Sequence, residues 1–423
     1  RNVTIPGPQS KALATRLRER EQRNVTFLAN DFPIFWNSAH GAIVTDVDGN
    51  DYIDCTAAFG VASLGHGNTR VAAAVAAQAE RLMHGMGDVH PTEIRVRLLD
   101  RLAAILPDAL SKAFLATGGS EAVEAALKTA MLFTGKSQFA TYRGGYHGLS
   151  FGALAVAGIE RFRTPFAGML RHEPVALHYP HSRENATEAA SHARDLLERH
   201  GDVAALVVEP IQGRGGCVVP PAGYLRQIAT ICRELNILLI VDEIFTGFAR
   251  TGTWFAIEHE GIVPDIICIG KAMGSGVPIS AAVGRGAVMD AWPLSTGEAL
   301  HTSTFLGNPL GCAAALTTVD EMERLELPAR AAAHGERLGP RLDALRRHPA
   351  VRDVRGRGML WGVSLRDGAT AFAAIKTALG RGVIFSQSGE DGSVIAISPP
   401  IIIEERHLEH ALDILESCIG AIE

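Results

Sequence analysis

The sequence predicts an α/β fold, with a large domain built on a mainly parallel sheet flanked by helices and a small α+β domain formed by both chain ends. Two observations support this fold class. Short apolar segments alternate with helical ones through the middle of the 423 residues, which is typical of βαβ units in a sheet covered on both faces. The two chain ends lack this alternation: we expect a hairpin near the N-terminus, and a helix, two strands and a helix near the C-terminus. We therefore expect residues 1–68 and 325–423 to form the small domain and residues 69–324 the large one.

The first elements are a helix and a hairpin. A charged helix is expected near Ser10–Asn24. A turn at Asp48-Gly49-Asn50 lies between the apolar segments Ala42–Thr45 and Tyr52–Ile53. An Asp-Gly turn between such segments predicts a β-hairpin.

Strands and helices alternate from about Thr69 onward. The expected strands are Lys112–Ala116, Gln138–Tyr142, Ala204–Glu209, Ile237–Asp242, Ile266–Ile269 and Ile279–Val283. The expected helices between them are Gly119–Phe133, Glu188–His200 and Gly223–Leu235. After about Arg324 we expect a helix, Leu327–Arg347, strands near Gly358–Ser364 and Val394–Ile397, and a last helix, Glu404–Ile422.

Composition excludes several classes of protein. Apolar residues make up 47% of the chain and charged residues 20%, which excludes a disordered protein. No apolar run is long enough to cross a bilayer, and the net charge of -6 argues against nucleic acid as a partner. Six scattered cysteines without a C-x-x-C pair, and a start without a signal-peptide pattern, predict a cytoplasmic location. His407 and His410 share a face of the charged last helix, which we interpret as solvated, so no metal is expected.

A glycine-rich turn opens one of the predicted helices. Gly118, Gly119 and Ser120 follow a strand and precede a helix, so free backbone N–H groups and the positive end of the helix dipole converge there. Such a site binds phosphate, although an ordinary capped helix explains the turn about equally well. A hydrolase nucleophile at Ser120 is disfavoured, because the G-x-S-x-G motif requires glycine where this chain has Ala122.

An acid and a lysine end two further buried strands. Asp242 closes the segment Ile237–Asp242, at the sheet edge where open α/β folds bind ligands. Taken alone, this acid is better explained as a cap for the next turn. Lys271 follows Ile266–Ile269 before another glycine-rich turn, and an amine differs from a guanidinium in that it can lose its proton and form a Schiff base.

Together these features resemble the class III aminotransferases, which are pyridoxal-phosphate (PLP) enzymes of fold type I that include 4-aminobutyrate and acetylornithine transaminases. The resemblance extends from Gly41–Asp54 to Pro399-Pro400. Its motifs are Gly118-Gly119-Ser120-Glu121-Ala122, Gly145-Tyr146-His147-Gly148, Glu209-Pro210-Ile211-Gln212-Gly213, Asp242-Glu243-Ile244, Gly270-Lys271, Thr304-Phe305-Leu306-Gly307-Asn308-Pro309 and Arg355-Gly356-Arg357-Gly358.

The resemblance implies catalytic roles for three residues. Lys271 would hold PLP as a Schiff base and then move a proton between the substrate carbon and the cofactor. Asp242 would pair with the pyridine nitrogen and keep it protonated, so that the ring accepts electrons. Glu209 would orient the reacting end of the pocket through hydrogen bonds.

The resemblance also implies how the cofactor is held. Tyr146 would stack on one face of the ring and Ile244 would pack on the other. Gly119 and Ser120 would bind the phosphate, and Thr304 would bind it from the neighbouring subunit of a homodimer with a shared active site. His147 is expected to be a structural neighbour of Tyr146 at the cofactor.

Four positions depart from the family pattern. Members acting on 4-aminobutyrate or ornithine usually carry arginine where this chain has Leu149, and a second arginine where it has Ala396. Arg214 replaces the acid that commonly follows E-P-x-Q-G, and it is either a compensating carboxylate ligand or a surface residue. Phe245 replaces a glutamine near the cofactor. Phe59, Leu149 and Phe245 predict a more apolar substrate pocket.

We therefore predict an aminotransferase that moves an amino group between an amine and an oxo acid. The missing arginines favour an amine without a carboxylate at the reacting end, such as an ω-amine or an amino sugar. The alternative is a PLP-dependent racemase or epimerase, which needs no arginine for an oxo acid. A cofactor-binding protein without activity is disfavoured because Lys271, Asp242 and Glu209 are all present.

Overall fold

The alternating segments in the middle of the chain form one seven-stranded sheet. The computed structural model describes residues 5–422. The strands are β4 (Leu110–Ala116), β5 (Gln138–Tyr142), β6 (Val175–Leu177), β7 (Val203–Val208), β8 (Leu238–Asp242), β9 (Ile266–Ile269) and β10 (Ser280–Arg285). Their order is β4-β10-β9-β8-β7-β5-β6.

The sheet is mainly parallel, as predicted, with one antiparallel strand. β9, β8, β7, β5 and β6 pair in parallel, whereas β10 runs antiparallel to both β9 and β4. Only residues 270–279 connect β9 to β10. A parallel connection needs a crossover of a dozen or more residues, so this short link returns the chain in the opposite direction.

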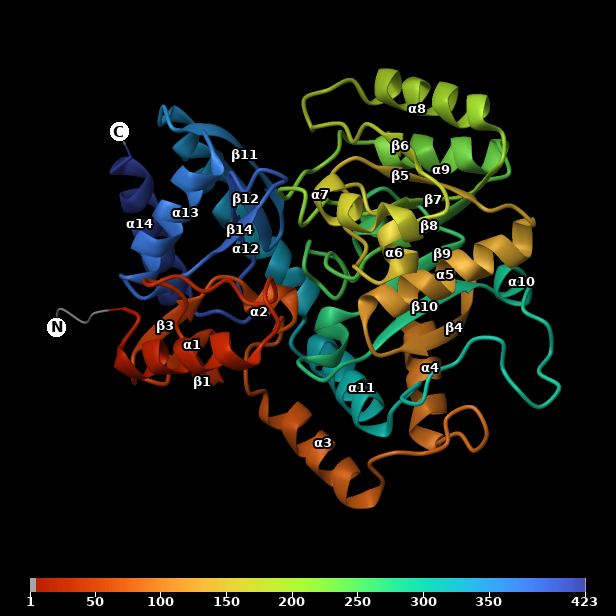
Figure 1. Ribbon diagram of the computed structural model, residues 1–423, viewed down its shortest axis with the longest axis horizontal. Helices are drawn as coiled ribbons and strands as arrows, with labels where there is room; N and C mark the ends of the chain where they lie inside the picture. The colour runs from red at the N-terminus through yellow and green to blue at the C-terminus, as the bar shows by residue number, and fades with distance from the viewer. Residues whose placement is uncertain (1–4, 423) are drawn as a thin grey trace.

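Helices cover both faces of this sheet. In β8, Leu239 packs in the apolar core that includes α8 (Ala186–His200) and α9 (Tyr224–Glu234), whereas Ile240 packs against α5 (Gly119–Thr134). Successive side chains of a strand point to opposite faces. Because both faces are buried, the strand is apolar throughout and does not alternate. Figure 1 shows α8 and α9 side by side, away from α5.

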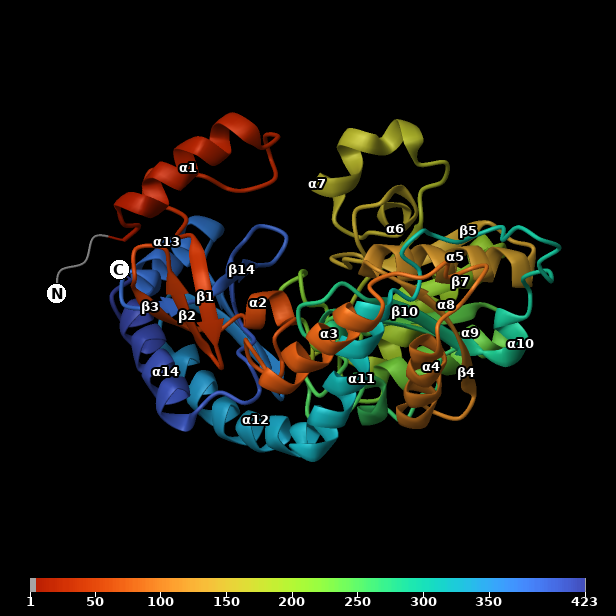
Figure 2. The same ribbon diagram turned by 90° about the horizontal axis from the view of Figure 1, so that it is seen from below.

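The two chain ends meet in a second region. One four-stranded sheet has the order β1-β2-β3-β13, with β1 (Trp36–His40), β2 (Ile43–Asp46), β3 (Asp51–Asp54) and β13 (Val383–Ile384). Another has the order β11-β12-β15-β14, with β11 (Val351–Arg357), β12 (Leu360–Leu365), β14 (Ser386–Ser388) and β15 (Val394–Ile397). Figure 2 shows both sheets on one side of the molecule and the seven-stranded sheet on the other.

The remaining helices complete both regions. They are α1 (Pro8–Arg20), α2 (Ala57–Gly60), α3 (Thr69–Arg81), α4 (Glu93–Ile105), α6 (Phe151–Ala155), α7 (Glu160–Arg163), α10 (Gly286–Met289), α11 (Pro309–Arg324), α12 (Leu327–Asp343), α13 (Gly368–Leu379) and α14 (Glu405–Gly420). Short 3-10 helices are η1 (Thr164–Met169), η2 (Ala256–His259), η3 (Lys271–Gly274) and η4 (Ala344–Arg347). Within residues 5–422, no helix is both long and apolar enough to span a membrane.

The predicted hairpin is present as β2 and β3, which pair antiparallel around Gly49. Two helix ends differ from prediction by four residues each, and the other helix ends differ by two or fewer. The first helix ends at Arg20 rather than Asn24, because Glu21 is extended and Asn24 adopts a left-handed conformation. The helix expected to reach Arg347 ends at Asp343 and continues as η4. Residues 1–4 and 423, parts of the expected small domain, lie outside the described residues.

Candidate active site

Three chemically reactive side chains lie at one edge of the large sheet. β7, β8 and β9 are adjacent and parallel, so their carboxyl ends meet there. Glu209 follows β7, Asp242 ends β8, and Lys271 lies two residues beyond β9. The topology thus places two carboxyl groups and an amine at one edge, as the sequence predicted.

Asp242 is buried and held by two hydrogen bonds. Its Oδ2 lies 2.8 Å from His147 Nδ1, and its Oδ1 accepts the backbone N–H of Ile244 at 3.0 Å. Burial lowers the pKa of His147, but the hydrogen bond to Asp242 and the charges of Asp242 and Glu209 together outweigh it, so the pKa is raised overall. The other ring nitrogen of His147, Nε2, is buried without a hydrogen-bond partner. His147 is therefore in place to fix the orientation of the Asp242 carboxylate.

Glu209 joins two loops of the site. Its Oε1 accepts the backbone N–H of Tyr146 at 2.8 Å, and its Oε2 accepts that of Gly213 at 3.0 Å. Burial raises the pKa of Glu209 to about 7. The group therefore titrates near neutrality and can hold a proton there.

Lys271 occupies a strained position in an apolar setting. Its φ of 45° lies in the left-handed region, which is costly for a residue with a side chain. Its Nζ lies 4.2 Å from the centroid of the Phe245 ring. Burial lowers the pKa of Lys271, although the charges of Asp242 and Glu209 act in the opposite direction. A lowered pKa increases the fraction of unprotonated amine, which is the nucleophilic form.

The start of α5 forms an open cradle. No side chain caps this helix, because its N-cap residue is Gly118. The Glu121 carboxylate accepts hydrogen bonds from the backbone and hydroxyl of Thr117. A Cβ on Gly119 would lie 2.8 Å from Ile244 Cδ1, so only glycine allows Ile244 to pack this closely. The backbone N–H groups at this end of the helix, including that of Ser120, can therefore bind an anion.

The sequence matches the family Aminotransferase class-III over residues 27–419. The chain belongs to this family. It is 38% identical to an acetylornithine aminotransferase of Methanopyrus kandleri, covering 92% of this chain and 95% of the relative. It is 36% identical to a putrescine aminotransferase of Pectobacterium atrosepticum, covering 95% of this chain and 86% of the relative.

Solved transaminase structures share the fold of this class III aminotransferase. An amine transaminase from an uncultivated Pseudomonas species, in its PLP-bound form, matches with a TM-score of 0.88 and 28% identity, covering 95% of this chain and 98% of the other. An ornithine aminotransferase from Toxoplasma gondii matches with a TM-score of 0.86 and 30% identity, covering 98% and 94%. The fold is that of PLP enzymes of fold type I, and the protein is a PLP-dependent aminotransferase.

The geometry of this aminotransferase fits PLP. The anion cradle at Gly119 and the amine of Lys271 suit the phosphate and the aldehyde of the cofactor, and buried Asp242 suits its pyridine nitrogen. Ile244 packs on both Gly119 and Gly270, so its side chain lies between the cradle and the lysine strand.

The residues predicted to form the substrate pocket differ in how far they are buried. The Phe245 ring packs tightly on Gly60 and Gly213, where an added Cβ would approach within 2.3 and 2.2 Å of it. Phe59 precedes Gly60 and is 71% exposed, and Leu149 is 50% exposed.

Arg214 and Thr304 lie outside the buried cluster. Arg214 is exposed, and its Nη1 donates to the carbonyl of Gln387 at 3.2 Å. Thr304 is exposed in the segment before α11.

The sequence did not identify Arg250 as part of the site. This buried side chain donates to the carbonyls of Met359 at 3.1 Å and Pro399 at 2.6 Å, and to Ser63 Oγ at 2.9 Å. Burial lowers the pKa of Arg250 to about 10, and its charge adds to the lowering of the pKa of Lys271. Its partners are remote in sequence, so no short motif could have revealed the role.

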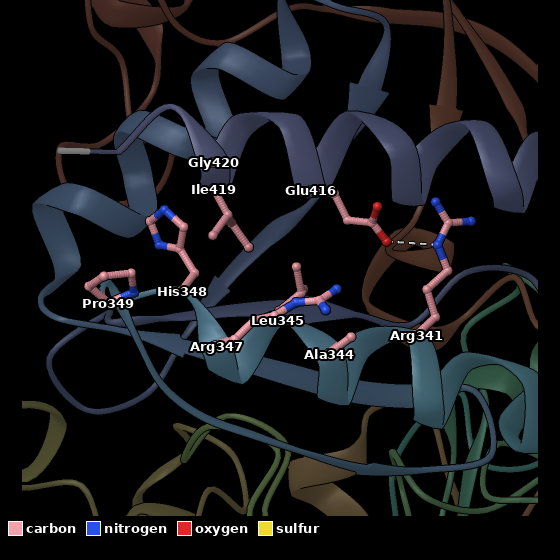
Figure 3. Close-up of a pocket in the computed structure, with 9 residues that line it drawn as sticks. All are labelled: Arg341, Ala344, Leu345, Arg347, His348, Pro349, Glu416, Ile419 and Gly420. Atoms are coloured by element: carbon pink, nitrogen blue, oxygen red, sulfur yellow. Dashed lines mark hydrogen bonds and ion pairs between the residues drawn. The ribbon is translucent and has the colours of Figure 1, made fainter.

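The surface pocket drawn in Figure 3 lies away from these residues. It is formed between α12, η4 and α14, and it is lined by Arg341, Ala344, Leu345, Arg347, His348, Pro349, Glu416, Ile419 and Gly420. Arg341 Nε donates to Glu416 Oε1 at 2.7 Å across one side of it. None of these residues belongs to the predicted site. Among residues 5–422, no cluster of histidine, cysteine or acidic side chains could hold a metal ion.

Proposed function

We propose that this aminotransferase takes its amino group from an amine without a carboxylate at the reacting end, an ω-amine or an amino sugar, and passes it to an oxo acid. The observation that carries this proposal is that apolar side chains, Leu149 and Ala396, stand where relatives commonly place carboxylate-binding arginines. Ala396 is buried with Ile211, Cys217 and Leu360, and Phe245 packs against them. A carboxylate in such surroundings would lack a charged partner, which is costly.

The names of two relatives agree with this substrate class. One is a putrescine aminotransferase, and putrescine is a diamine. The other is an amine transaminase.

The catalytic proposal assigns the chemistry to three side chains. PLP supplies an electron sink that stabilises negative charge on the substrate carbon. Lys271 Nζ would hold the cofactor covalently and would carry the proton to and from that carbon. Asp242, fixed by His147, would hold the proton on the pyridine nitrogen. Glu209 fixes the loops of Tyr146 and Gly213 relative to each other.

The remaining assignments concern binding and assembly. Gly119 and Ser120 bind the phosphate through their backbone N–H groups, and Tyr146 and Ile244 enclose the ring. Thr304 completes the phosphate site of the partner in a homodimer, which accords with its exposed position. The substrate pocket is lined by Phe59, Leu149, Arg214 and Phe245.

We also propose domain boundaries and a location. Residues 1–68 and 325–423 form the small domain and residues 69–324 the large one, in keeping with the pairing of β3 with β13. All six cysteines are free and buried, which accords with a cytoplasmic enzyme.

The test is a screen of the first half-reaction, followed by the visible absorbance of the lysine-bound cofactor. ω-Amines and amino sugars should bleach this band faster than 2-aminobutyrate does, because 2-aminobutyrate carries its carboxylate on the reacting carbon, and an oxo acid should restore the band. Equal or faster bleaching by 2-aminobutyrate would contradict the proposed substrate class. Exchange of the substrate α-hydrogen with deuterium, without amino transfer to any oxo acid, would instead indicate a racemase or epimerase.

A further inference from the structure

Two arginines donate hydrogen bonds to one loop at the edge of the site. Arg214 Nη1 donates to the carbonyl of Gln387 at 3.2 Å. Arg161 Nη1 donates to the carbonyl of Glu390 at 2.8 Å. Both guanidinium groups are therefore anchored within a four-residue segment, residues 387–390, and both side chains remain exposed to incoming ligands.

The backbone beneath Arg214 is rigidly held. Its carbonyl accepts the N–H of Gly389 at 3.1 Å and the hydroxyl of Ser388 at 3.0 Å. The same hydroxyl lies 2.9 Å from the carbonyl of Gly213. The guanidinium thus extends from a fixed turn, so less conformational entropy is lost when it binds a ligand.

Arg161 is fixed by aromatic packing. Its guanidinium carbon lies 4.9 Å from the centroid of Phe162, whose ring stands edge-on to that of Tyr146 at 5.8 Å. Tyr146 in turn donates its N–H to Glu209. Figure 1 shows α7, which carries Arg161, at the border between the large sheet and the region of β14. Arg161 therefore lies just outside the predicted cofactor site.

Neither guanidinium is neutralised within the described chain. Each donates to a carbonyl, and neither forms an ion pair with a carboxylate of residues 5–422. The Glu390 carboxylate is directed toward Gly144, where an added Cβ would lie 3.3 Å from its Oε1. Partial burial lowers the pKa of Arg214, and the charge on Arg161 lowers it further, so the two cations repel each other. An anion between them would relieve this repulsion.

We propose that Arg161 and Arg214 together bind a carboxylate of the oxo-acid acceptor. This proposal rests on the proposed function, because it names the group that replaces the arginine missing at Ala396. Two guanidinium groups can each donate charge-assisted hydrogen bonds to a carboxylate, which makes them strong and selective ligands for it. A donor amine without a carboxylate makes no use of the pair. One site thereby accepts two unlike substrates in turn.

The test measures the two half-reactions separately in Arg161→Ala, Arg214→Ala and the double variant. Affinity for 2-oxoglutarate in the second half-reaction should fall about 10-fold in each single variant and about 100-fold in the double variant. The first half-reaction with the amine should lose less in each variant than the second half-reaction does, because only the oxo acid supplies a carboxylate to the pair. Arg214→Lys should recover part of the loss. Arg226→Ala is the matched control, because this exposed arginine also donates to a backbone carbonyl, that of Glu260 at 2.9 Å, away from the site.

A binding measurement separates this proposal from the proposed function. Glutarate lacks the oxo group, so calorimetric titration of the holoenzyme with glutarate reports carboxylate binding without reaction. The dissociation constant should rise about 10-fold in each single variant and increase with ionic strength. Unchanged glutarate and 2-oxoglutarate affinities, or equal losses in both half-reactions, would overturn the arginine site. If the wild type transfers no amino group to any oxo acid, the proposed function fails, and glutarate binding still tests the arginines.

Discussion

Glu243 provides a quantitative test of how burial affects this fold. Its buried carboxyl accepts the hydroxyl of Thr246 at 2.6 Å and the N–H of Ile257 at 2.7 Å, and it forms no ion pair within residues 5–422. Burial raises its pKa from 4.5 to about 7. A group whose pKa is higher in the folded state than in the unfolded state stabilises the fold fully at pH values below its unfolded-state pKa. This stabilisation is lost as the pH rises through its folded-state pKa. The difference between the two pKa values corresponds to about 3 kcal/mol of unfolding free energy, which is lost between about pH 4.5 and pH 7.

Glu243→Gln should remove this pH dependence. The amide oxygen can accept the N–H of Ile257, and the amide nitrogen can donate to Thr246 once its hydroxyl rotates, so packing is kept. The variant should match the wild type within about 1 kcal/mol at pH 5 and exceed its stability by about 3 kcal/mol at pH 8. Urea denaturation of the apoenzyme across this range measures the difference.

A control variant at Glu321 should show the opposite dependence of stability on pH. Glu321 is paired with Arg324 and Arg70, and its hydrogen bond to Arg324 holds the pKa of Glu321 below the usual range. Glu321→Gln should therefore lose stability near neutral pH and little at low pH. If the free energies of unfolding of the wild type and Glu243→Gln change with pH in the same way, burial of Glu243 does not raise its pKa.

Three further substitutions test the active site and its support. Lys271→Ala should abolish the visible absorbance of bound PLP and the activity while the chain still folds; a retained band would contradict the assignment. Gly119→Ala places a methyl 2.8 Å from Ile244 Cδ1, so the Kd for PLP should rise about 10-fold, whereas Gly420→Ala, with open space around it, should leave it unchanged. Arg250→Met removes the donor for three buried acceptors and should lower stability by about 3 kcal/mol in thermal or urea unfolding; an unchanged Tm would show that these bonds are dispensable.

The sequence was sufficient to predict the fold class and the meeting of Asp242 and Lys271. Buried strands are recognisable as apolar runs, and residues at the carboxyl ends of neighbouring parallel strands share one edge of the sheet. β10 runs antiparallel because its connection to β9 is short. The length of that connection was known only once the ends of both strands were established. The cytoplasmic location and the catalytic roles of individual residues stay predictions.

Contacts between remote segments were beyond the sequence. Arg250 is hydrogen-bonded to residues as distant as Pro399, and Arg161 contacts a loop 229 residues further along the chain. Arg214 stood out only because it differs from the family pattern, and its anchoring to Gln387 depends on how the two regions dock. Arginine side chains are long and commonly solvated, so a pattern of residues does not show which of them are held in place.

The pairing of β3 with β13 has a consequence for synthesis of the chain. Ile53 pairs with Val383, about 330 residues later, and Cys55 donates its N–H to Ile384. The N-terminal strands therefore leave the ribosome long before the strand that covers their edge exists. Until then β3 exposes unpaired backbone groups, which other nascent chains could join. We expect the central α/β region, whose strands are near neighbours in sequence, to fold first and to hold the two ends until they meet.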